Sequence, residues 1–208
     1  LRLKEAGGGD VVAITCGPAR AAKMLTDAAA VGADSLMHVQ IDGHDSLDST
    51  QIQSVLAAAL GRAECDVVFC GKQAADTNGG STGPGVAMLM GASCVSHVSE
   101  VSADGGGYLA LRSSSGGNER VHVSAPCVFA FDKGSEELRR PNVRGIMMAK
   151  KKAIETVSPE DLGVSIDASR VTLVSHSPPP EKPPGQKFEG ADSVATVVGK
   201  LRDEANVI

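Results

Sequence analysis

Short apolar runs alternate, along the first third of the chain, with longer segments whose apolar residues recur every three or four positions. The runs at 10–15, 36–41 and 66–70 have the length and the β-branched content of buried strands. Between them, 18–32 and 50–63 show helical spacing. Strands that alternate with helices predict a parallel sheet flanked by helices and joined by right-handed crossovers. We therefore predict a Rossmann-like α/β fold.

The pattern changes after about residue 93. Alternating segments separated by Gly- and Ser-rich turns predict a short antiparallel meander over 95–123, and 126–132 has the pattern of another buried strand. The proline-rich stretch 177–185 cannot form a core helix or central strand and predicts an extended C-terminal arm. Apolar residues at helical spacing predict a terminal helix over 192–208. The predicted domains are 1–157 and 158–208.

Composition and charge narrow the classes of partner. The net charge of −5 and the 2% aromatic content disfavour a nucleic-acid-binding surface, which needs basic patches and stacking platforms. The five cysteines include no CxxC pair and no zinc-like spacing, so we expect free thiols and no metal site. No apolar run approaches the roughly 20 residues that span a bilayer, so we expect no direct membrane insertion.

The segment after the third predicted strand carries the most specific chemistry. It is rich in glycine and small polar residues and leads into a helix that Pro84 opens. Glycines let the main chain approach a ligand closely, and the free amides of a helix N-terminus favour an anion. The pattern predicts a phosphate or nucleotide cradle, although it is neither GxGxxG nor a Walker A motif. A long surface loop built from turn residues is the alternative. The predicted contacts are Gly71, Lys72, Gln73, Ala74, Asp76, Thr77, Asn78, Gly79, Gly80, Ser81 and Thr82.

No catalytic constellation accompanies this loop. The five histidines are scattered, and we interpret His38 and His122 as strand-surface residues. Asp132 ends a predicted strand, where a helix cap or turn role is favoured over a catalytic carboxylate. Cys16 lies between a strand and a helix, where its thiol pKa could be lowered, but we interpret it as packing in a ligand loop. We therefore predict that the chain is not an enzyme in its own right.

Four motifs, in order along the chain, resemble the beta subunit of the electron transfer flavoprotein family. They cover nearly the whole chain, and together they are far more specific than any one of them. The motifs are the opening Leu1-Arg2-Leu3-Lys4-Glu5-Ala6-Gly7 with Ile14-Thr15-Cys16-Gly17-Pro18, the loop Gly71-Lys72-Gln73-Ala74-(Ala75)-Asp76 with Thr82-Gly83-Pro84, the segment Arg139-Arg140-Pro141-Asn142-Val143-Arg144-Gly145-Ile146-Met147-Met148-Ala149-Lys150-Lys151-Lys152, and Asp161-Leu162-Gly163-Val164.

The resemblance implies a heterodimer whose alpha subunit holds the redox FAD, while the beta subunit buries a structural AMP. It implies electron transfer from flavin dehydrogenases, notably acyl-CoA dehydrogenases, to a membrane quinone oxidoreductase. It places Cys16 in the first AMP loop and the predicted contacts of 71–82 in the second. The chain departs from the family at Gly80 and Ser81, which replace an Asn-Gln pair. The resemblance also implies that the family's first strand precedes Leu1.

The resemblance further implies that 136–152 is a recognition loop, in which one apolar side chain enters a pocket of the dehydrogenase. Val143 stands at that position, where leucine is usual. The alternative is that Val143 packs under its own loop. The residues predicted to contact the partner are Arg140, Pro141, Asn142, Val143, Ile146 and Met147. The arm and terminal helix in 158–208 are expected to clasp the alpha subunit.

Two alternatives stay open at this stage. The chain could be a stand-alone adenine-nucleotide domain, either of an ATP-dependent enzyme or of a nucleotide-sensing stress protein. Bifurcating relatives hold a second FAD in place of AMP, but their loop differs, so we favour AMP. The compartment is expected to be the mitochondrial matrix, with the bacterial cytoplasm as the alternative.

Overall fold

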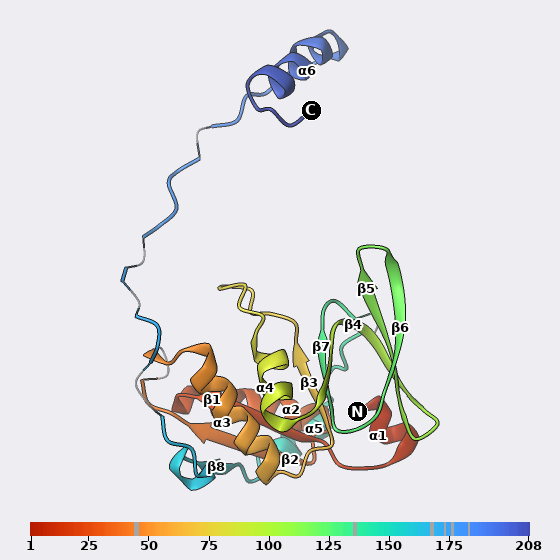
Figure 1. Ribbon diagram of the computed structural model, residues 1–208, viewed down its shortest axis with the longest axis vertical. Coiled ribbons are helices and arrows are strands. Elements are labelled where there is room, and N and C mark those ends of the chain that lie inside the picture. Colours follow the sequence, from red (N-terminus) through yellow and green to blue (C-terminus); the bar gives the residue numbers. More distant parts are fainter. Residues whose placement is uncertain (44–45, 135–136, 167–168, 173, 176, 183) are drawn as a thin grey trace. The chain divides into compact units, whose positions relative to one another are not determined.

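A computed structural model describes residues 1–43, 46–134, 137–166, 169–172, 174–175, 177–182 and 184–208. The chain divides into two compact units, Leu1–Thr172 and Leu173–Ile208, and each is described by itself. The first unit holds all of the described strands (Figure 1).

The strands of the first unit form two sheets. A three-stranded parallel sheet has the order β1-β2-β8, and a five-stranded sheet has the order β3-β7-β4-β5-β6. In the larger sheet β3, β7 and β4 are parallel, whereas β4, β5 and β6 are antiparallel. The bounds are β1 (Val12–Gly17), β2 (Ser35–Gln40), β3 (Val67–Gly71), β4 (Ser93–Asp104), β5 (Gly107–Ser114), β6 (Gly117–Val123), β7 (Cys127–Phe131) and β8 (Glu155–Val157).

The predicted α/β fold and the antiparallel meander are confirmed. The unexpected feature is that β1 and β3 belong to different sheets, whereas a continuous doubly wound sheet would contain both strands. Both strands are edges in the described sheets, and a cavity of about 690 Å³ lies between them. Phe69 of β3 remains 48% exposed there. We call this cavity the slot.

Helices cover the parallel strands, as the sequence pattern predicts (Figure 1). Their positions follow the local stop and start signals. Asp48 and Gln51 form a reciprocal capping box at the start of α3. Gly91 ends α4 in the left-handed conformation, with φ of 64°. The helices of this unit are α1 (Arg2–Gly7), α2 (Ala22–Val31), α3 (Ser49–Arg62), α4 (Thr82–Met90) and α5 (Val143–Ala149), with 3-10 turns at Ala19–Ala21 and Glu160–Leu162.

Each sheet has its own hydrophobic core. Val39 of β2 and Val55 of α3 are completely buried in the core of the smaller sheet. In the larger sheet, Phe129 of β7 is completely buried and stacks on Phe69, with ring centroids 5.7 Å apart. Each sheet is therefore packed by its own core, and the slot lies between one packed edge strand of each sheet.

The carboxylate of Asp48 also ties α3 to a distant segment. Its Oδ2 accepts hydrogen bonds from the Arg170 amide at 2.9 Å and the Ser169 hydroxyl at 3.4 Å, while Oδ1 accepts from the Gln51 amide at 3.0 Å. These bonds, first the one from Arg170 and then the one from Gln51, lower the pKa of Asp48 below its ordinary value of 3.8. A group with a lowered pKa contributes stability above its unfolded-state pKa, and the contribution is lost as pH falls through the lowered value.

We therefore expect the wild-type chain to lose thermal stability more steeply than the Asp48→Asn variant below about pH 4. Asparagine is a good helix cap but does not titrate. The measurement is the melting temperature of both proteins between pH 3 and pH 6. Parallel curves would show that ionisation of Asp48 does not stabilise the cap.

The second unit contains one 3-10 turn (Ala191–Ser193) and α6 (Val194–Asp203). The described residues of 177–190 form neither helix nor strand, in agreement with the predicted extended arm. Val194, Val198 and Leu201 of α6 are exposed and lie at helical spacing. Residues 158–172, which we assigned to the arm, belong to the first compact unit.

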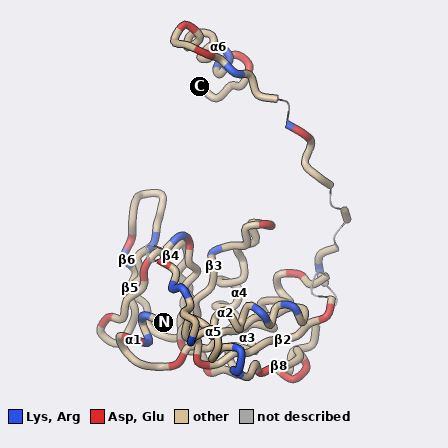
Figure 2. The backbone as a smooth tube through the Cα atoms, turned by 180° about the vertical axis from the view of Figure 1, so that it is seen from behind, with Lys and Arg blue, Asp and Glu red and all other residues tan. Residues whose placement is uncertain are grey.

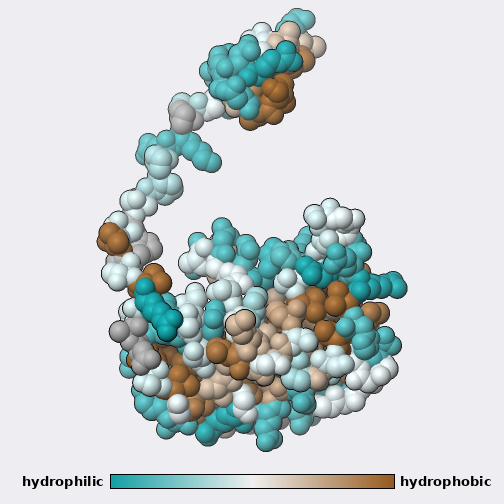
Figure 3. Space-filling model, in the orientation of Figure 1, coloured by the Kyte–Doolittle hydropathy of each residue, from teal (hydrophilic) through white to brown (hydrophobic). Residues whose placement is uncertain are grey.

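Among the described residues, no helix is long and apolar enough to cross a membrane. Lysine and arginine are interspersed with aspartate and glutamate over the first unit (Figure 2). Apolar residues reach the surface of this unit in a band on the face that Figure 3 shows.

Candidate nucleotide-binding site

The loop between β3 and α4 has a defined internal structure. The Ala74 amide donates to the Gly79 carbonyl at 3.0 Å, and the Asn78 amide donates to the Ala74 carbonyl at 3.0 Å. The Gln73 side chain donates to Oδ1 of Asn78 at 3.1 Å, and Asn78 adopts a positive φ of 53°. The loop therefore closes on itself through its main chain rather than lying extended.

This internal bonding restricts which amides can meet a ligand. The Thr77 amide donates to its neighbour Asp76 at 2.8 Å, and the Gly79 amide donates to the Thr77 hydroxyl at 3.2 Å. In the part of the chain that the structure describes, the amides of residues 80–83 donate to no other group. They lie at the N-terminal end of α4, where free amides and the helix dipole favour an anion. The predicted cradle thus narrows to the last residues of the loop.

Gly83 brings this end of α4 against the sheet. A Cβ at Gly83 would lie 2.8 Å from Sγ of Cys70 in β3 and 3.3 Å from Cβ of Ala130 in β7. Both distances are shorter than ordinary van der Waals contact, so only glycine allows this approach. Thr82 and Gly83 also line the slot together with Ile14 of β1. The first half of β1 and the start of α4 thus border one cavity.

Cys16 lies near this cavity but is not among its lining residues. It is the last residue but one of β1, is half-buried, and packs against the core of the smaller sheet. Burial raises the pKa of the Cys16 thiol to about 11, so it stays protonated at neutral pH. The expectation that strand-end placement could lower this pKa is wrong, because desolvation dominates. Its interpretation as a packing residue agrees with the structure.

Lys72 does not extend freely toward the cradle. Its ammonium lies 2.7 Å from Oδ2 of Asp132, which follows β7. The ion pair, followed by the Lys133 amide bond to the other carboxylate oxygen, lowers the pKa of Asp132. Asp132 therefore pairs with a loop lysine in addition to the local turn role that we favoured, in which its carboxylate accepts from the Lys133 amide.

Gln53 of α3 is a contact that sequence reasoning missed. Its Nε2 donates to the Ser81 carbonyl at 3.0 Å and lies 3.1 Å from the Ser81 hydroxyl oxygen. A lone glutamine on the exposed face of an amphipathic helix carries no motif, so no local signal could have identified it. Asp132 did carry a weak signal, because it directly follows a buried strand.

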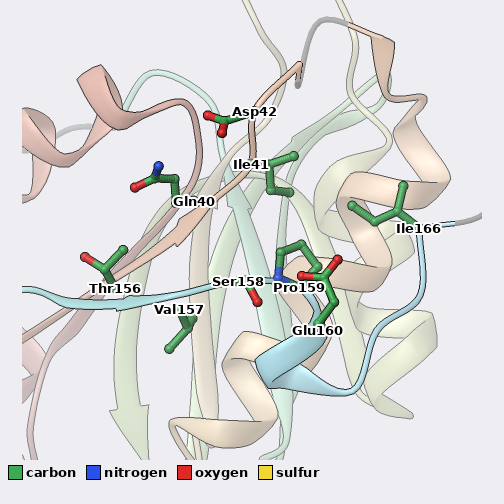
Figure 4. A pocket seen from close by; sticks show the side chains of 9 residues that line it. All are labelled: Gln40, Ile41, Asp42, Thr156, Val157, Ser158, Pro159, Glu160 and Ile166. Carbon is green, nitrogen blue, oxygen red and sulfur yellow. The ribbon is translucent and has the colours of Figure 1, made fainter.

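A second cavity of about 490 Å³ lies at the carboxyl ends of β2 and β8. Figure 4 shows Gln40 at the end of β2, Asp42 in the loop that follows it, Thr156 on β8, and Glu160 below. The carboxylates of Asp42 and Glu160 disfavour a phosphate here. The anion-binding geometry therefore points to the α4 end and not to this cavity. Its lining residues are Gln40, Ile41, Asp42, Thr156, Val157, Ser158, Pro159, Glu160 and Ile166.

The predicted recognition segment forms a short capped helix. Asn142 caps α5, its Oδ1 accepting from the Gly145 amide at 2.7 Å. Val143 is 75% exposed, which contradicts the alternative that it packs under its own loop. Ile146 and Met147 are exposed as well. Arg140 and Pro141 lie exposed before the helix, and residue 136 falls outside the described residues.

The remaining candidate groups form no reactive cluster. His38, expected on a strand surface, is instead 1% exposed, and its Nε2 lies 3.1 Å from the Gly17 carbonyl. Packing between the crossover helices and β2 buries both faces of that strand, which a pattern of alternating residues does not reveal. His122 is exposed, as expected. No group of histidine, cysteine and acidic residues suited to a metal occurs within the described ranges.

Comparison with known proteins places this geometry in a family. Residues 1–162 match the electron transfer flavoprotein domain. The chain is 33% identical over 210 residues to the electron transfer flavoprotein subunit beta of Mus musculus, covering 100% of this chain and 81% of the mouse protein. It is 32% identical to the Homo sapiens subunit, covering 98% and 79%, and 31% identical to that of Bacillus subtilis (strain 168), covering 100% and 83%. The chain therefore belongs to the beta-subunit family of the electron transfer flavoproteins.

Proposed function

We propose that this chain is the beta subunit of a heterodimeric electron transfer flavoprotein that binds AMP at the α4 end. In this proposal FAD is held mainly by the alpha subunit. The complex takes electrons from acyl-CoA and related flavin dehydrogenases and delivers them to a quinone oxidoreductase. Membership of the family supports the electron-transfer role. The observation that supports a nucleotide is the row of unused amides at 80–83.

Each part of the loop has its own task in the proposed site. The amides of 80–83 and the hydroxyls of Ser81 and Thr82 would meet the phosphate, because they lie at the positive end of α4. The residues from Gly71 to Asn78 shape the loop through its internal hydrogen bonds. Cys16 packs against the core of the smaller sheet as a neutral thiol.

Mass analysis of the nucleotide released on denaturation tests this proposal. The chain is purified with its co-expressed partner and denatured, and the soluble fraction is analysed. We expect AMP in equal amount to the chain, together with FAD in equal amount to the partner. Two FAD per complex would contradict AMP at this site. Release of FAD alone, in equal amount to the complex, would contradict nucleotide binding by this chain.

A stand-alone ATP-dependent enzyme fits the site less well. Such an enzyme needs carboxylates for Mg²⁺ and a lysine grip on the phosphates. Asp76 accepts from the Thr77 amide, and Lys72 is paired with Asp132. ATP hydrolysis by the chain alone, at a rate that Asp76→Asn abolishes, would favour the enzyme over the carrier.

The exposed apolar residues of α5 support the proposed recognition role. Val143 would enter an apolar pocket of the dehydrogenase, surrounded by Ile146 and Met147. Replacing Val143 by leucine adds one methylene, which is worth about 0.8 kcal/mol when buried and corresponds to about a fourfold change in affinity. We therefore expect Val143→Leu to lower the KM of the dehydrogenase for the complex about fourfold.

The matched control is Val171→Leu, a similarly exposed valine outside the segment. It should leave the KM unchanged. A KM for Val143→Leu that equals or exceeds that of the wild type would show that Val143 does not enter a pocket with room for leucine.

We also propose that the arm and α6 contact the alpha subunit. The exposed apolar residues of α6 support this, because an isolated helix of ten residues gains stability by burying such a face. The relatives come from mammals and from bacteria. The proposed compartment is accordingly the mitochondrial matrix or the bacterial cytoplasm.

A further inference from the structure

The start of the loop is held by the strand beside it. The Lys72 amide donates to the Phe131 carbonyl at 2.6 Å, and the Lys72 ammonium pairs with Asp132 at 2.7 Å. Asp132 is itself fixed, since its amide donates to the Val98 carbonyl at 3.0 Å. The first residue of the loop is thus joined by main chain and side chain to the end of β7.

The end of the loop is held from a different element. Gln53 of α3 reaches Ser81 through one side-chain nitrogen, at 3.0 Å from its carbonyl oxygen and 3.1 Å from its hydroxyl oxygen. Gly85 makes room for this contact, because a Cβ there would overlap the Gln53 carboxamide. Ser81 directly precedes α4, so the contact holds the residue whose amide belongs to the anion-binding row.

We infer that Asp132 and Gln53 are positioning residues that set the nucleotide affinity of the loop from outside it. Asp132 acts through Lys72 at one end, and Gln53 acts through Ser81 at the other. Together they hold the two ends at a fixed separation, so that the amides of 80–83 stay directed at one point. The inference rests on the proposed nucleotide function.

Gln53 has a side-chain carboxamide, a group that positions 80 and 81 of the loop lack. The family resemblance implies an Asn-Gln pair where this chain has Gly80 and Ser81. Gln53 brings a carboxamide to that position from the neighbouring helix. After donating to Ser81 it keeps a free acceptor oxygen. The carboxamide that is missing from the loop is therefore supplied by α3.

The Lys72–Asp132 ion pair and the Gln53–Ser81 contact both lie near solvent. Removing either should therefore affect the loop more than the stability of the whole chain. The side chains of Lys72 and Asp132 are 26% and 46% exposed, and pairs of this kind contribute little to folding. Ser81 is exposed, so water can replace the Gln53 donor. Loss of either contact should therefore loosen the loop without unfolding the chain.

The test compares Gln53→Met and Asp132→Asn with two controls. Methionine keeps the length of glutamine and removes the donor, and asparagine keeps the shape of aspartate and removes the charge. Ser54→Ala alters the adjacent position of α3, and Glu155→Gln removes the exposed ion pair with Arg62. The measurements on the full chain in its complex are AMP affinity by calorimetry after nucleotide removal, hydrogen exchange of 74–79, and melting temperature.

We expect Gln53→Met and Asp132→Asn each to weaken AMP binding five- to tenfold and to speed exchange at Ala74 and Asn78. Both controls should stay within twofold of wild type, and all melting temperatures should agree closely. The paired exchange of Lys72→Asp with Asp132→Lys restores the ion pair with reversed polarity. It should recover most of the lost affinity if Lys72 only positions the loop.

Two outcomes would overturn the inference. Gln53→Met and Asp132→Asn could change affinity and exchange no more than the controls do, or the charge exchange could bind as weakly as Asp132→Asn alone. Absence of AMP binding by the wild type would instead contradict the proposed nucleotide function. In that case hydrogen exchange still decides whether the two residues hold the loop.

Discussion

Replacing Gly83 by alanine is expected to weaken AMP binding by at least tenfold while the chain stays folded. The added Cβ would lie 2.8 Å from Sγ of Cys70 and 3.3 Å from Cβ of Ala130, so the start of α4 must move away from β3 and β7. The unused amides of 80–83 would move with it. A displacement of a few tenths of an ångström would weaken their hydrogen bonds to the phosphate, because hydrogen bonds weaken steeply with distance and angle.

A second substitution distinguishes this cause from a general loss of stability. Cys70→Ala removes the closer of the two atoms and should by itself bind AMP within about twofold of the wild type, because it leaves the main chain of β3 and of α4 unchanged. Combined with Gly83→Ala, it should recover most of the affinity, since the remaining contact with Ala130 requires only a small adjustment.

Calorimetric titration of AMP into the four proteins of this cycle provides the measurement, with circular dichroism to confirm folding. Strictly additive effects of the two substitutions would show that the contact between Gly83 and Cys70 does not set the position of α4. Normal binding by Gly83→Ala would show that the α4 end is not the phosphate site.

The site also shows how far local sequence patterns extend. Glycines, a helix-opening proline and a preceding buried strand are local signals, so the loop after β3 could be predicted as a cradle. The side chains that hold it could not, because Gln53 lies 28 positions before Ser81 and Asp132 lies 60 positions after Lys72. Contacts between distant positions depend on which strands become neighbours, and no pattern within one segment contains that information.

The same limit explains the errors on individual residues. His38 alternates with apolar residues in the sequence, yet both faces of β2 are covered, so it is buried. Cys16 lies near the end of β1, a position that favours thiolate formation only when the site is open to solvent or near a positive charge. Here the core of the smaller sheet surrounds it, and desolvation determines its pKa. The strands and helices of the first 132 residues were largely predictable, whereas α5, β8 and the burial of individual side chains were not, because they depend on how the elements pack.

The slot between β1 and β3 provides the prediction with the largest expected effect on stability. Its two edges are strands of six and five residues, and α3 and α4 contribute Leu56, Leu60 and Val86 to its walls. A parallel strand of about five residues, at the usual spacing of about 4.8 Å from each neighbour, would pair with both edges. It would be apolar on both faces, as central strands of parallel sheets are.

We expect that five consecutive valine or isoleucine residues, flanked by lysine and fused ahead of Leu1 through a flexible linker, will raise the melting temperature by about 5–10 °C. Burying five such side chains contributes roughly 10 kcal/mol, and ordering five residues costs roughly 7.5 kcal/mol, which leaves about 2.5 kcal/mol. A strand that enters from this end continues into α1 and then β1, which forms a right-handed β-α-β unit.

The matched control is the same fusion with proline at the central position. Proline lacks a main-chain N–H donor and is excluded from central strands. Hydrogen exchange at β1 and β3 locates the effect, since pairing should protect amides on the slot side of both strands. If the two fusions melt at the same temperature, the added segment does not enter the slot. If only β3 gains protection, the opening is wider than one strand.

Protection of both β1 and β3 would show that the added strand joins the two described sheets into one. The order would be β6-β5-β4-β7-β3 on one side of the added strand and β1-β2-β8 on the other. The ends of β1 and β3 would then be held at a fixed separation, and the loop that follows β3 would be anchored to both halves of the unit.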